Sequence, residues 1–284
     1  MLLRELIEHA AKRFEEAGID SATVDAELLA GHLLGLSRGG VQTEMILGTE
    51  LPQAQADLLT QMYGRRLARE PLQHITGIAY FRNLELQVGK GVFVPRPETE
   101  FVAQLAIDAI TRAPEEAPLA VDLGTGSGAI ALAMATEMPN AKIFAVEKSS
   151  EALPFTKLNF ETYGGQNATL IQGDLADALG ELNGTVSVVA SNPPYIPTDA
   201  VPRDIEVKLH DPDLALYGGE DGMQVMHLVS ATAKRLLVTG GALIVEHADS
   251  QATQVCELLL ADGWREVISH KDLTGRDRAV TAIK

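Results

Sequence analysis

The chain has 284 residues, of which 46% are hydrophobic and 22% charged, and its formal net charge is −16. This composition is typical of a globular protein with room for one large or two smaller domains. The acidity argues against unaided binding of nucleic acid, which needs a basic surface to neutralise phosphates. We expect no membrane association, because no apolar run approaches the ~20 residues that span a bilayer. The single cysteine, Cys256, excludes an internal disulfide and predicts a cytoplasmic location.

Residues 1–72 are predicted to form a small all-α domain. Apolar residues recur at helical spacing from Leu2 to Ala10, Gly35 can end a second helix, and Pro52 can begin a third that runs to about Arg69. The only basic cluster of this domain is assigned to a solvated helix face and consists of Arg65, Arg66 and Arg69.

Residues 73–95 are predicted to form a β-hairpin linker. Two short apolar runs, 78–81 and 84–88, flank Arg82-Asn83, a pattern typical of two strands joined by a tight turn. Pro95 and Pro97 follow, and then an acidic first turn that favours a helix reaching about residue 112.

From residue 96 to 284 the pattern predicts a doubly wound, Rossmann-like α/β domain. Expected strands lie near residues 119–123, 141–147, 168–172, 185–191, 242–247, 264–268 and 278–283, and expected helices near 127–136, 150–162, 222–237 and 250–260. Continuous apolar strands that alternate with helices indicate a mainly parallel seven-stranded sheet covered on both faces.

A glycine-rich segment follows the first strand of this domain and opens a helix. It comprises Gly124, Thr125, Gly126, Ser127 and Gly128. Glycines let the backbone approach a ligand closely, and a helix N-terminus supplies free N–H groups and a positive field. The segment also fits a loose dinucleotide-binding fingerprint, so NAD is an alternative at this point.

Two acidic residues end the next strands. Glu147, about twenty residues beyond the glycines, can accept the two ribose hydroxyls of a nucleoside, whether of NAD or of another cofactor. Asp174 ends the third strand and can meet an adenine amino group or cap a helix.

The fourth strand ends in Asn192-Pro193-Pro194-Tyr195. Two prolines force the chain out of the sheet as a stiff loop, at the edge where open α/β sheets bind ligands. The loop offers a side-chain amide, backbone carbonyls and an aromatic ring. This set of groups suits a planar NH2 group, whose hydrogens need acceptors and whose faces can be packed against.

These three motifs together resemble class I S-adenosylmethionine-dependent methyltransferases. The whole chain is similar to the peptide chain release factor glutamine methyltransferases, through the segments Val94–Glu100, Ala215–Gly222 and Asp272–Arg278. The resemblance implies methyl transfer from S-adenosylmethionine to the amide nitrogen (N5) of the glutamine in the Gly-Gly-Gln motif of class I release factors. It also implies that the helical domain docks these partners, without direct contact to nucleic acid, and we expect a monomer.

The resemblance assigns roles to individual residues. The cofactor would be held by residues 124–128, Glu147, Asp174, Leu175 and Asn192, with no metal. The substrate amide would be held by Asn192, Pro193, Pro194 and Tyr195, of which Asn192, Pro193 and Tyr195 would be catalytic. The Asn192 side-chain oxygen and the Pro193 carbonyl would accept the two N–H hydrogens, and the Tyr195 ring would pack on the amide.

Two positions depart from the family pattern. Leu175 stands where relatives often have an aromatic residue beside adenine, which removes stacking and leaves only apolar packing. His247 stands where many relatives have glycine, and we assign it no catalytic role. In the segment before residue 100, Phe93, Arg96 and Glu98 could form a wall of the site. Helix initiation would explain Pro97 and Glu98 equally well, and Arg96 could instead pair with an acidic residue for a purely structural purpose.

Three other functions account for part of the pattern. An adenine-N6 methyltransferase faces the same geometric problem at an exocyclic amine, but the net charge of −16 disfavours nucleic acid. An NAD-dependent oxidoreductase leaves the Asn-Pro-Pro-Tyr segment without a purpose. A regulatory domain that binds the nucleoside without turnover would not need Asn192 and Tyr195.

Overall fold

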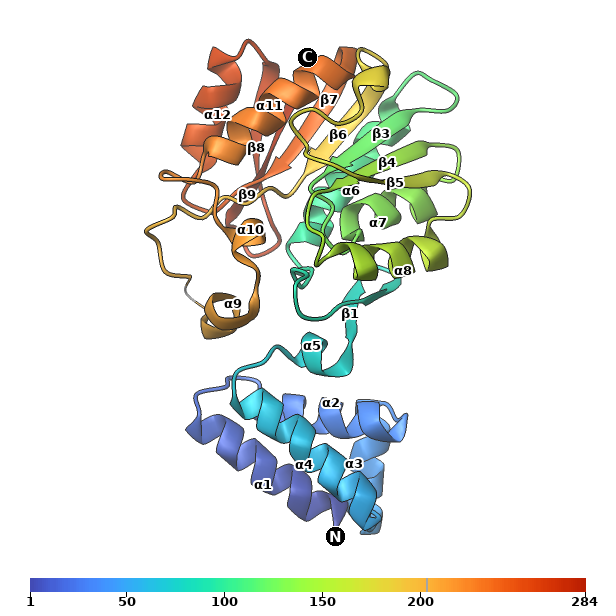
Figure 1. Cartoon of the computed structure of the whole chain (residues 1–284), viewed down its shortest axis with the longest axis vertical. Coiled ribbons are helices and arrows are strands. Elements are labelled where there is room, and N and C mark those ends of the chain that lie inside the picture. Colours follow the sequence, from blue (N-terminus) through green and yellow to red (C-terminus); the bar gives the residue numbers. More distant parts are fainter. Residues whose placement is uncertain (203) are drawn as a thin grey trace. The chain divides into compact units, whose positions relative to one another are not determined.

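The computed structural model describes residues 1–202 and 204–284, and the chain separates into two compact units. The first unit contains residues 1–77 and helix α9 (Ile205–His210). The second contains residues 78–202 and 211–284 (Figure 1). The chain therefore passes from the first unit to the second after Gly77, and the segment that carries α9 groups with the first unit. No sequence motif predicted this return.

The first unit is helical, as predicted. Its helices are α1 (Leu3–Glu16), α2 (Ala22–Leu34), α3 (Arg38–Leu47), α4 (Gln53–Leu67), α5 (Leu72–Thr76) and α9. Phe14 of α1 and Tyr63 of α4 are fully buried and meet edge to face, with ring centroids 5.7 Å apart. The Tyr63 hydroxyl donates to the Ala26 carbonyl at 3.0 Å, which satisfies its polar atom inside the core. Helices α3 and α5 were not predicted.

Two arginines of the predicted basic cluster are ion-paired rather than solvated. The Arg66 guanidinium is buried and donates to Asp25 of α2 at 2.7 Å and to Glu206 of α9 at 3.0 Å. Arg69 donates to the second oxygen of Glu206 at 2.9 Å. The assignment of these arginines to a solvated helix face was wrong, because three carboxylate contacts stabilise charges that are buried or largely buried.

The second unit begins with the predicted hairpin. Strands β1 (Ile78–Phe81) and β2 (Leu84–Gln87) pair antiparallel, with Phe81 opposite Leu84 across the turn. Arg82 in that turn has φ +52° and donates to the Glu137 carboxylate at 2.7 Å. Glu137 is the last residue of helix α7 (Ala129–Glu137), so the turn is tied to the end of that helix. The hairpin therefore packs as part of the second unit.

The other described strands of this unit form one seven-stranded sheet in the order β5-β4-β3-β6-β7-β9-β8. The strands are β3 (Leu119–Leu123), β4 (Lys142–Glu147), β5 (Ala168–Gln172), β6 (Val186–Ser191), β7 (Leu237–Glu246), β8 (Arg265–Lys271) and β9 (Asp277–Ile283). Strands β3 to β7 are parallel, and β9 pairs antiparallel with both β7 and β8. The predicted mainly parallel sheet is confirmed.

Helices cover both faces of the sheet, as Figure 1 shows. Helices α6 (Thr99–Arg112), α7 (Ala129–Glu137) and α8 (Leu153–Tyr163) lie on one face, and α11 (Gln224–Leu236) and α12 (Ala252–Ala261) on the other. Alternate residues of a strand face opposite helices: Ala120 packs with α6 and α7, whereas Val121 packs with α11. The short elements α10 (Asp213–Leu216) and η1 (Gly180–Leu182) lie in connections.

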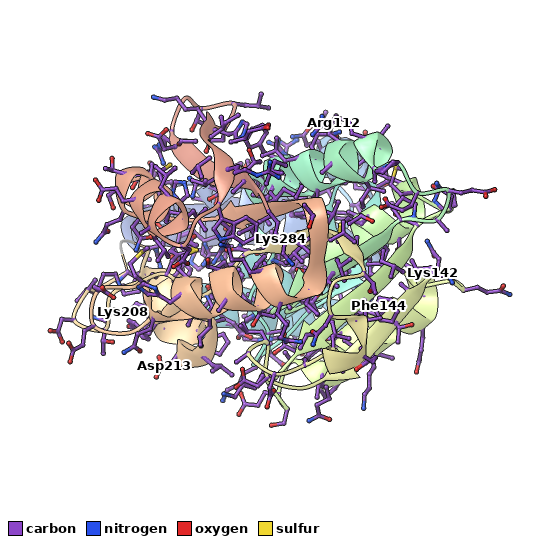
Figure 2. The ribbon with its side chains drawn as sticks, turned by 90° about the horizontal axis from the view of Figure 1, so that it is seen from above. Arg112, Lys142, Phe144, Lys208, Asp213 and Lys284 are labelled. Carbon is purple, nitrogen blue, oxygen red and sulfur yellow. The ribbon has the colours of Figure 1, made fainter. Side chains whose placement is uncertain are left out.

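The two ends of the sheet hold different parts of the chain. Figure 2 labels Arg112, Lys142 and Lys284, which belong to the end where the parallel strands begin. Lys142 starts β4, and Lys284 follows β9 and bonds Gly240 and Gly241 of β7. The glycine-rich segment and the Asn-Pro-Pro-Tyr segment lie at the opposite, carboxyl end. No helix among the described residues is long and apolar enough to cross a membrane.

The ion pair of Arg66 generates a stability prediction. Arg66→Ala leaves Asp25 buried without its partner, which costs about 3 kcal/mol when a buried pair is broken. We expect the free energy of opening of α2 and α4 to fall by that amount, as measured by hydrogen exchange of the full chain. Lys12→Ala, which removes an exposed pair with Glu16, is the control and should leave exchange unchanged. Equal effects of the two changes would contradict the prediction.

Candidate active site

The candidate site lies at the carboxyl ends of four adjacent strands. Strand β3 pairs with β4 on one side and with β6 on the other, and β7 lies beyond β6. The connections after β3 and β6 leave this edge in different directions, which makes it the switch point where open α/β sheets bind ligands. The predicted residues of both motifs therefore share one edge of one sheet.

The glycine-rich segment turns sharply between β3 and α7. Gly124, Gly126 and Gly128 have φ of +76°, +57° and +91°, a region that favours glycine. A Cβ at Gly124 or Gly126 would meet no atom within 4 Å, so these two leave open space beside the backbone. A Cβ at Gly128 would lie 2.9 Å from the Phe160 ring. The first two glycines thus suit close approach of a ligand, and the third suits packing of α7 against α8.

The buried carboxyl group of Asp122 hydrogen-bonds to residues in and just after this turn. Asp122, 1% exposed, accepts from the Thr125 hydroxyl at 2.6 Å and from the Ala131 N–H at 3.1 Å. Burial raises the pKa of Asp122 to about 7, although both hydrogen bonds lower it. No role was predicted for Asp122, although it stands two residues before the first glycine.

Glu147 at the end of β4 reaches back to the same turn. Its carboxylate oxygens accept from the Gly126 N–H and the Ser149 N–H, each at 2.7 Å. Burial raises the pKa of Glu147, and these bonds oppose that shift. Each carboxylate oxygen keeps a further lone pair, so the group can accept ribose hydroxyls while it holds the loop.

Asp174 lies at the surface after β5. It pairs with Lys148 at 2.8 Å and accepts from the Ala176 N–H at 3.0 Å. The hydrogen bond from Lys148 lowers the pKa of Asp174. Residues 175–179 form a turn and not a helix, so Asp174 pairs with Lys148 and bonds within this turn and caps no helix there. Adenine recognition stays a prediction. Leu175 is partly buried against the cluster under α11, which suits an apolar role.

Asn192 follows β6 and is partly buried, and its side chain points back to helix α6. Its Nδ2 donates to the Thr99 hydroxyl at 3.3 Å. The preceding Ser191 hydroxyl donates to the Leu123 carbonyl of β3 at 2.7 Å, so the strand end is fixed on both sides. This bond uses one of the two amide hydrogens of Asn192 and faces the nitrogen toward Thr99, and the amide oxygen has no hydrogen bond to the described residues, so it is available to a ligand.

The backbone of Pro194 and Tyr195 is clamped by a glycine-rich segment that the sequence analysis recorded only as a family match. A Cβ at Gly218 would lie 2.5 Å from the Pro194 carbonyl oxygen, and one at Gly222 would lie 2.3 Å from that of Tyr195. Gln251 donates from Nε2 to the same Tyr195 carbonyl at 2.9 Å. Gln251, which begins α12 as its N-cap residue, is a further site residue that the sequence did not reveal.

The remaining candidates have structural partners. Arg96 lies over the Phe93 ring at 4.8 Å and donates to Asp211 at 2.7 Å, which agrees with the ion-pair alternative for Arg96. His247 is fully buried with its Nδ1 2.7 Å from the Ala248 carbonyl, and burial lowers the pKa of its ring. Its position inside the core agrees with the absence of an assigned catalytic role.

The donor and acceptor set fits a nucleoside cofactor. Open space at Gly124 and Gly126, a carboxylate at Glu147 and the N-terminus of α7 meet at one turn. Among the described residues there is no cluster of three or more side chains that could hold a metal ion.

Comparison with known proteins identifies the family. Residues 5–77 match the model described as PrmC N-terminal domain, and residues 83–210 match the Methyltransferase small domain. A release factor glutamine methyltransferase of Streptomyces coelicolor is 48% identical over 287 residues, which cover 100% of this chain and 98% of that protein. The chain belongs to the release factor glutamine methyltransferase family. It is a class I methyltransferase, for which S-adenosylmethionine is the methyl donor.

Relatives of this family differ in their substrates. A protein of Streptomyces pristinaespiralis named 4-amino-L-phenylalanine/4-methylamino-L-phenylalanine methyltransferase is 37% identical and covers 99% of this chain and 95% of its own length. A methyltransferase from Pyrococcus furiosus has a similar fold, with a TM-score of 0.52 at 19% identity over 79% of this chain and 95% of that one.

The clamp on Tyr195 generates a prediction. Gly222→Ala introduces a Cβ where only 2.3 Å is available, so the Asn-Pro-Pro-Tyr backbone must move. We expect turnover to fall about 100-fold, the loss that ~1 Å of misplacement causes, with cofactor binding retained. Gly240→Ala is the matched control, since its φ is +88° and its Cβ would meet nothing within 4 Å. Similar turnover in the two variants would show that backbone strain, and not the clamp, matters.

The contacts of Glu147 generate a prediction about cofactor affinity. Glu147→Ala removes the acceptor for ribose hydroxyls and releases the Gly126 N–H. We expect the affinity for S-adenosylmethionine, measured by calorimetry, to fall by about 3 kcal/mol, the value of one to two hydrogen bonds to a charged group. Glu161→Ala changes the net charge equally on the exposed face of α8 and serves as the control. Unchanged affinity in Glu147→Ala would remove this residue from the cofactor site.

Proposed function

We propose that this protein transfers the methyl group of S-adenosylmethionine to the side-chain amide nitrogen (N5) of the glutamine in the Gly-Gly-Gln motif of class I peptide chain release factors. One observation carries the proposal: Asn192 turns its amide nitrogen to Thr99 and so presents its oxygen. An acceptor in this position suits an NH2 group on the substrate. Family membership supports a release factor as the partner.

The chemical difficulty is that the nitrogen lone pair of an amide is delocalised into its carbonyl. Asn192 Oδ1 and the Pro193 carbonyl would accept the two N–H hydrogens, which orients the nitrogen and stabilises the positive charge that develops on it. No donor to the Pro193 carbonyl is found within residues 1–202 and 204–284. The rings of Pro193 and Pro194 stiffen the loop that carries this carbonyl, so the acceptor needs little further ordering during the reaction.

Held at the glycine turn and Glu147, S-adenosylmethionine would supply an electrophilic methyl group for the substrate nitrogen, and the N–H proton that leaves would pass to water. The residues of the site orient the substrate nitrogen and stabilise the charge that develops on it. None acts as a strong base before transfer. Tyr195, clamped at its carbonyl by Gln251, would lay its ring on the flat amide and exclude water.

The helical domain is proposed to dock the release factor, and the enzyme would act as a monomer without direct contact to nucleic acid. Translation termination takes place in the cytoplasm, so the proposal places the enzyme there. Docking by residues 1–72 rests on the match of residues 5–77 to the family's N-terminal domain.

A free aromatic amine is the second candidate substrate. The relative named for 4-amino-L-phenylalanine is similar over its whole length, and an arylamine also presents a planar NH2 group. The two substrates are distinguished by presenting each to the enzyme with S-adenosylmethionine and measuring the product by mass.

The decisive experiment uses a purified class I release factor and intact-mass analysis followed by peptide mapping. We expect a single added methyl group on the Gly-Gly-Gln glutamine. Asn192→Ala should lower turnover by about 100-fold, because an oriented acceptor is lost, and should leave cofactor affinity nearly unchanged. Equal losses of turnover and cofactor affinity would contradict the role given to Asn192. Methylation of the arylamine but not of the release factor would favour the second candidate.

A further inference from the structure

The outer edge of the hairpin is covered by side chains of helix α8. The Tyr163 hydroxyl accepts from the Glu85 N–H of β2 at 3.1 Å and donates to the Glu85 carbonyl at 3.2 Å. The Asn159 amide does the same at Gln87: its oxygen accepts from the N–H at 2.7 Å, and its nitrogen donates to the carbonyl at 3.0 Å. Both backbone groups of two alternate residues of β2 are therefore bonded to α8.

The spacing of the two elements makes this contact regular. Two residues of a strand span ~6.8 Å and four residues of a helix span ~6 Å, so alternate residues of the strand can meet every fourth residue of the helix. Gly89 and Phe155 form a third pair just beyond β2, since a Cβ at Gly89 would lie 2.5 Å from the Phe155 ring. The side chains of α8 thus take the place of a third strand at this edge.

Helix α8 also holds two carbonyls of the glycine turn. Asn159 Nδ2 donates to the Ser127 carbonyl at 2.9 Å, in addition to its bond to β2. The Thr156 hydroxyl lies 2.6 Å from the Gly126 carbonyl oxygen and 3.0 Å from that of Ala152, so the shorter bond is the one to the turn. Thr156 and Asn159 are 0% and 1% exposed, so water does not replace these bonds in the folded chain.

These bonds decide which backbone groups of the turn remain for a ligand. In a planar trans peptide the C=O and the N–H point in opposite directions. A Gly126 carbonyl that is held by α8 therefore turns the Ser127 N–H away from that helix. In the described part of the chain the Ser127 N–H meets no hydrogen-bond acceptor, and a Cβ at Gly126 would meet open space. The turn thus keeps an N–H group for a ligand and directs its carbonyls into the protein.

We propose that Thr156 and Asn159 are positioning residues that keep the carbonyls of the glycine turn directed toward α8 and so leave its N–H groups for S-adenosylmethionine. Asn159 bonds strand β2 with the same side chain, so the turn and the hairpin edge are coupled. A cofactor that binds only the ordered turn should therefore also stabilise the bonds of Gln87. The inference depends on the methyl donor of the family and not on the proposed substrate.

Thr156 variants test the positioning role. Thr156→Val keeps the shape of the side chain but leaves the Gly126 carbonyl without its donor, so the empty turn can rotate that carbonyl to water. Binding of the cofactor then has to reverse this rotation, at the cost of an unpaired buried carbonyl. We expect the Kd for S-adenosylmethionine, measured by calorimetry, to rise about 10-fold, with kcat at saturating cofactor nearly unchanged. Thr156→Ser, which restores the hydroxyl, should recover most of the affinity.

A matched control lies in the same helix. Thr162→Val also removes a hydroxyl from α8, but that hydroxyl donates at 2.8 Å to the Leu158 carbonyl of α8 itself, at an exposed position. We expect its Kd for S-adenosylmethionine to equal that of the unchanged protein. Equal Kd values in Thr156→Val and Thr162→Val would overturn the positioning role, and so would equal losses in Thr156→Val and Thr156→Ser.

Hydrogen exchange tests the coupling without any substrate. Glu85 and Gln87 both donate their N–H groups to α8, but only Asn159, the partner of Gln87, also bonds the glycine turn. S-adenosylmethionine at about ten times its Kd lowers the population of the open turn about 10-fold. We expect exchange of the Gln87 N–H, followed by nuclear magnetic resonance of the full chain, to slow by about that factor, and exchange of the Glu85 N–H to stay unchanged. Equal slowing at both residues, or at neither, would overturn the coupling.

Tyr163→Phe and Asn159→Ala separate the two sets of bonds. Tyr163→Phe releases the hairpin at Glu85 alone, so we expect the Kd for S-adenosylmethionine to stay unchanged. Asn159→Ala releases both Gln87 and the turn, so the Kd should rise and the effect of the cofactor on Gln87 should disappear. An equal rise in Kd in the two variants would show that α8 only supports the fold and would overturn the inference. If these differences hold but a release factor is not methylated, the proposed function fails and the positioning role stands.

Discussion

Burial of carboxyl groups at the carboxyl edge of the parallel sheet is the constraint on which the site depends. Glu147 and Glu246 end β4 and β7, and Asp122 is the last residue but one of β3. Burial is the largest cause of a raised pKa in each of the three. Such groups persist only where donors meet them, and here the donors are the functional loops themselves. Asp122 accepts from the Thr125 hydroxyl and the Ala131 N–H, and Glu147 accepts from the Gly126 N–H. The shape of the glycine turn therefore follows from the need to satisfy these two acids.

Burial of these carboxyl groups lowers the free energy of unfolding at neutral pH. The pKa values of Asp122 and Glu246 are raised to about 7 from ordinary values of 3.8 and 4.5. Between about pH 4 and pH 7 the folded state therefore binds more protons than the unfolded state at these two groups. Their contribution to stability falls as the pH rises through that window. An enzyme built only for stability would lack these acids, so their presence agrees with a site that favours oriented acceptors over maximal stability.

The sequence predicted most of the fold because its local signals agree with the tertiary structure. Strand β3 and strand β5 have the predicted bounds, and the hairpin and α6 lie where the proline and turn signals indicated. It could not predict that α9 groups with the first unit, because a six-residue helix carries no local signal of its packing partner. That grouping depends on Glu206, which pairs with Arg66 of α4 and with Arg69 just after that helix, both far away in the sequence.

The site was predictable where one motif held all the groups, and not where the groups came from separate elements. Asn192 was found from its own neighbours, but its partner Thr99 lies 93 residues earlier, at the start of a helix that a proline and acidic residues already explained. Glu246 looked like an ordinary strand end, since only the pairing of β6 with β7 brings it to the substrate loop. The same holds in part for Gly222: its φ of +75° is a feature of its own turn, but the lack of space for a Cβ arises from the Tyr195 carbonyl of a separate segment. Residues that orient the candidate site can thus be identified only from the packing of the structure. Residues proposed to contact the substrate can be predicted from sequence motifs.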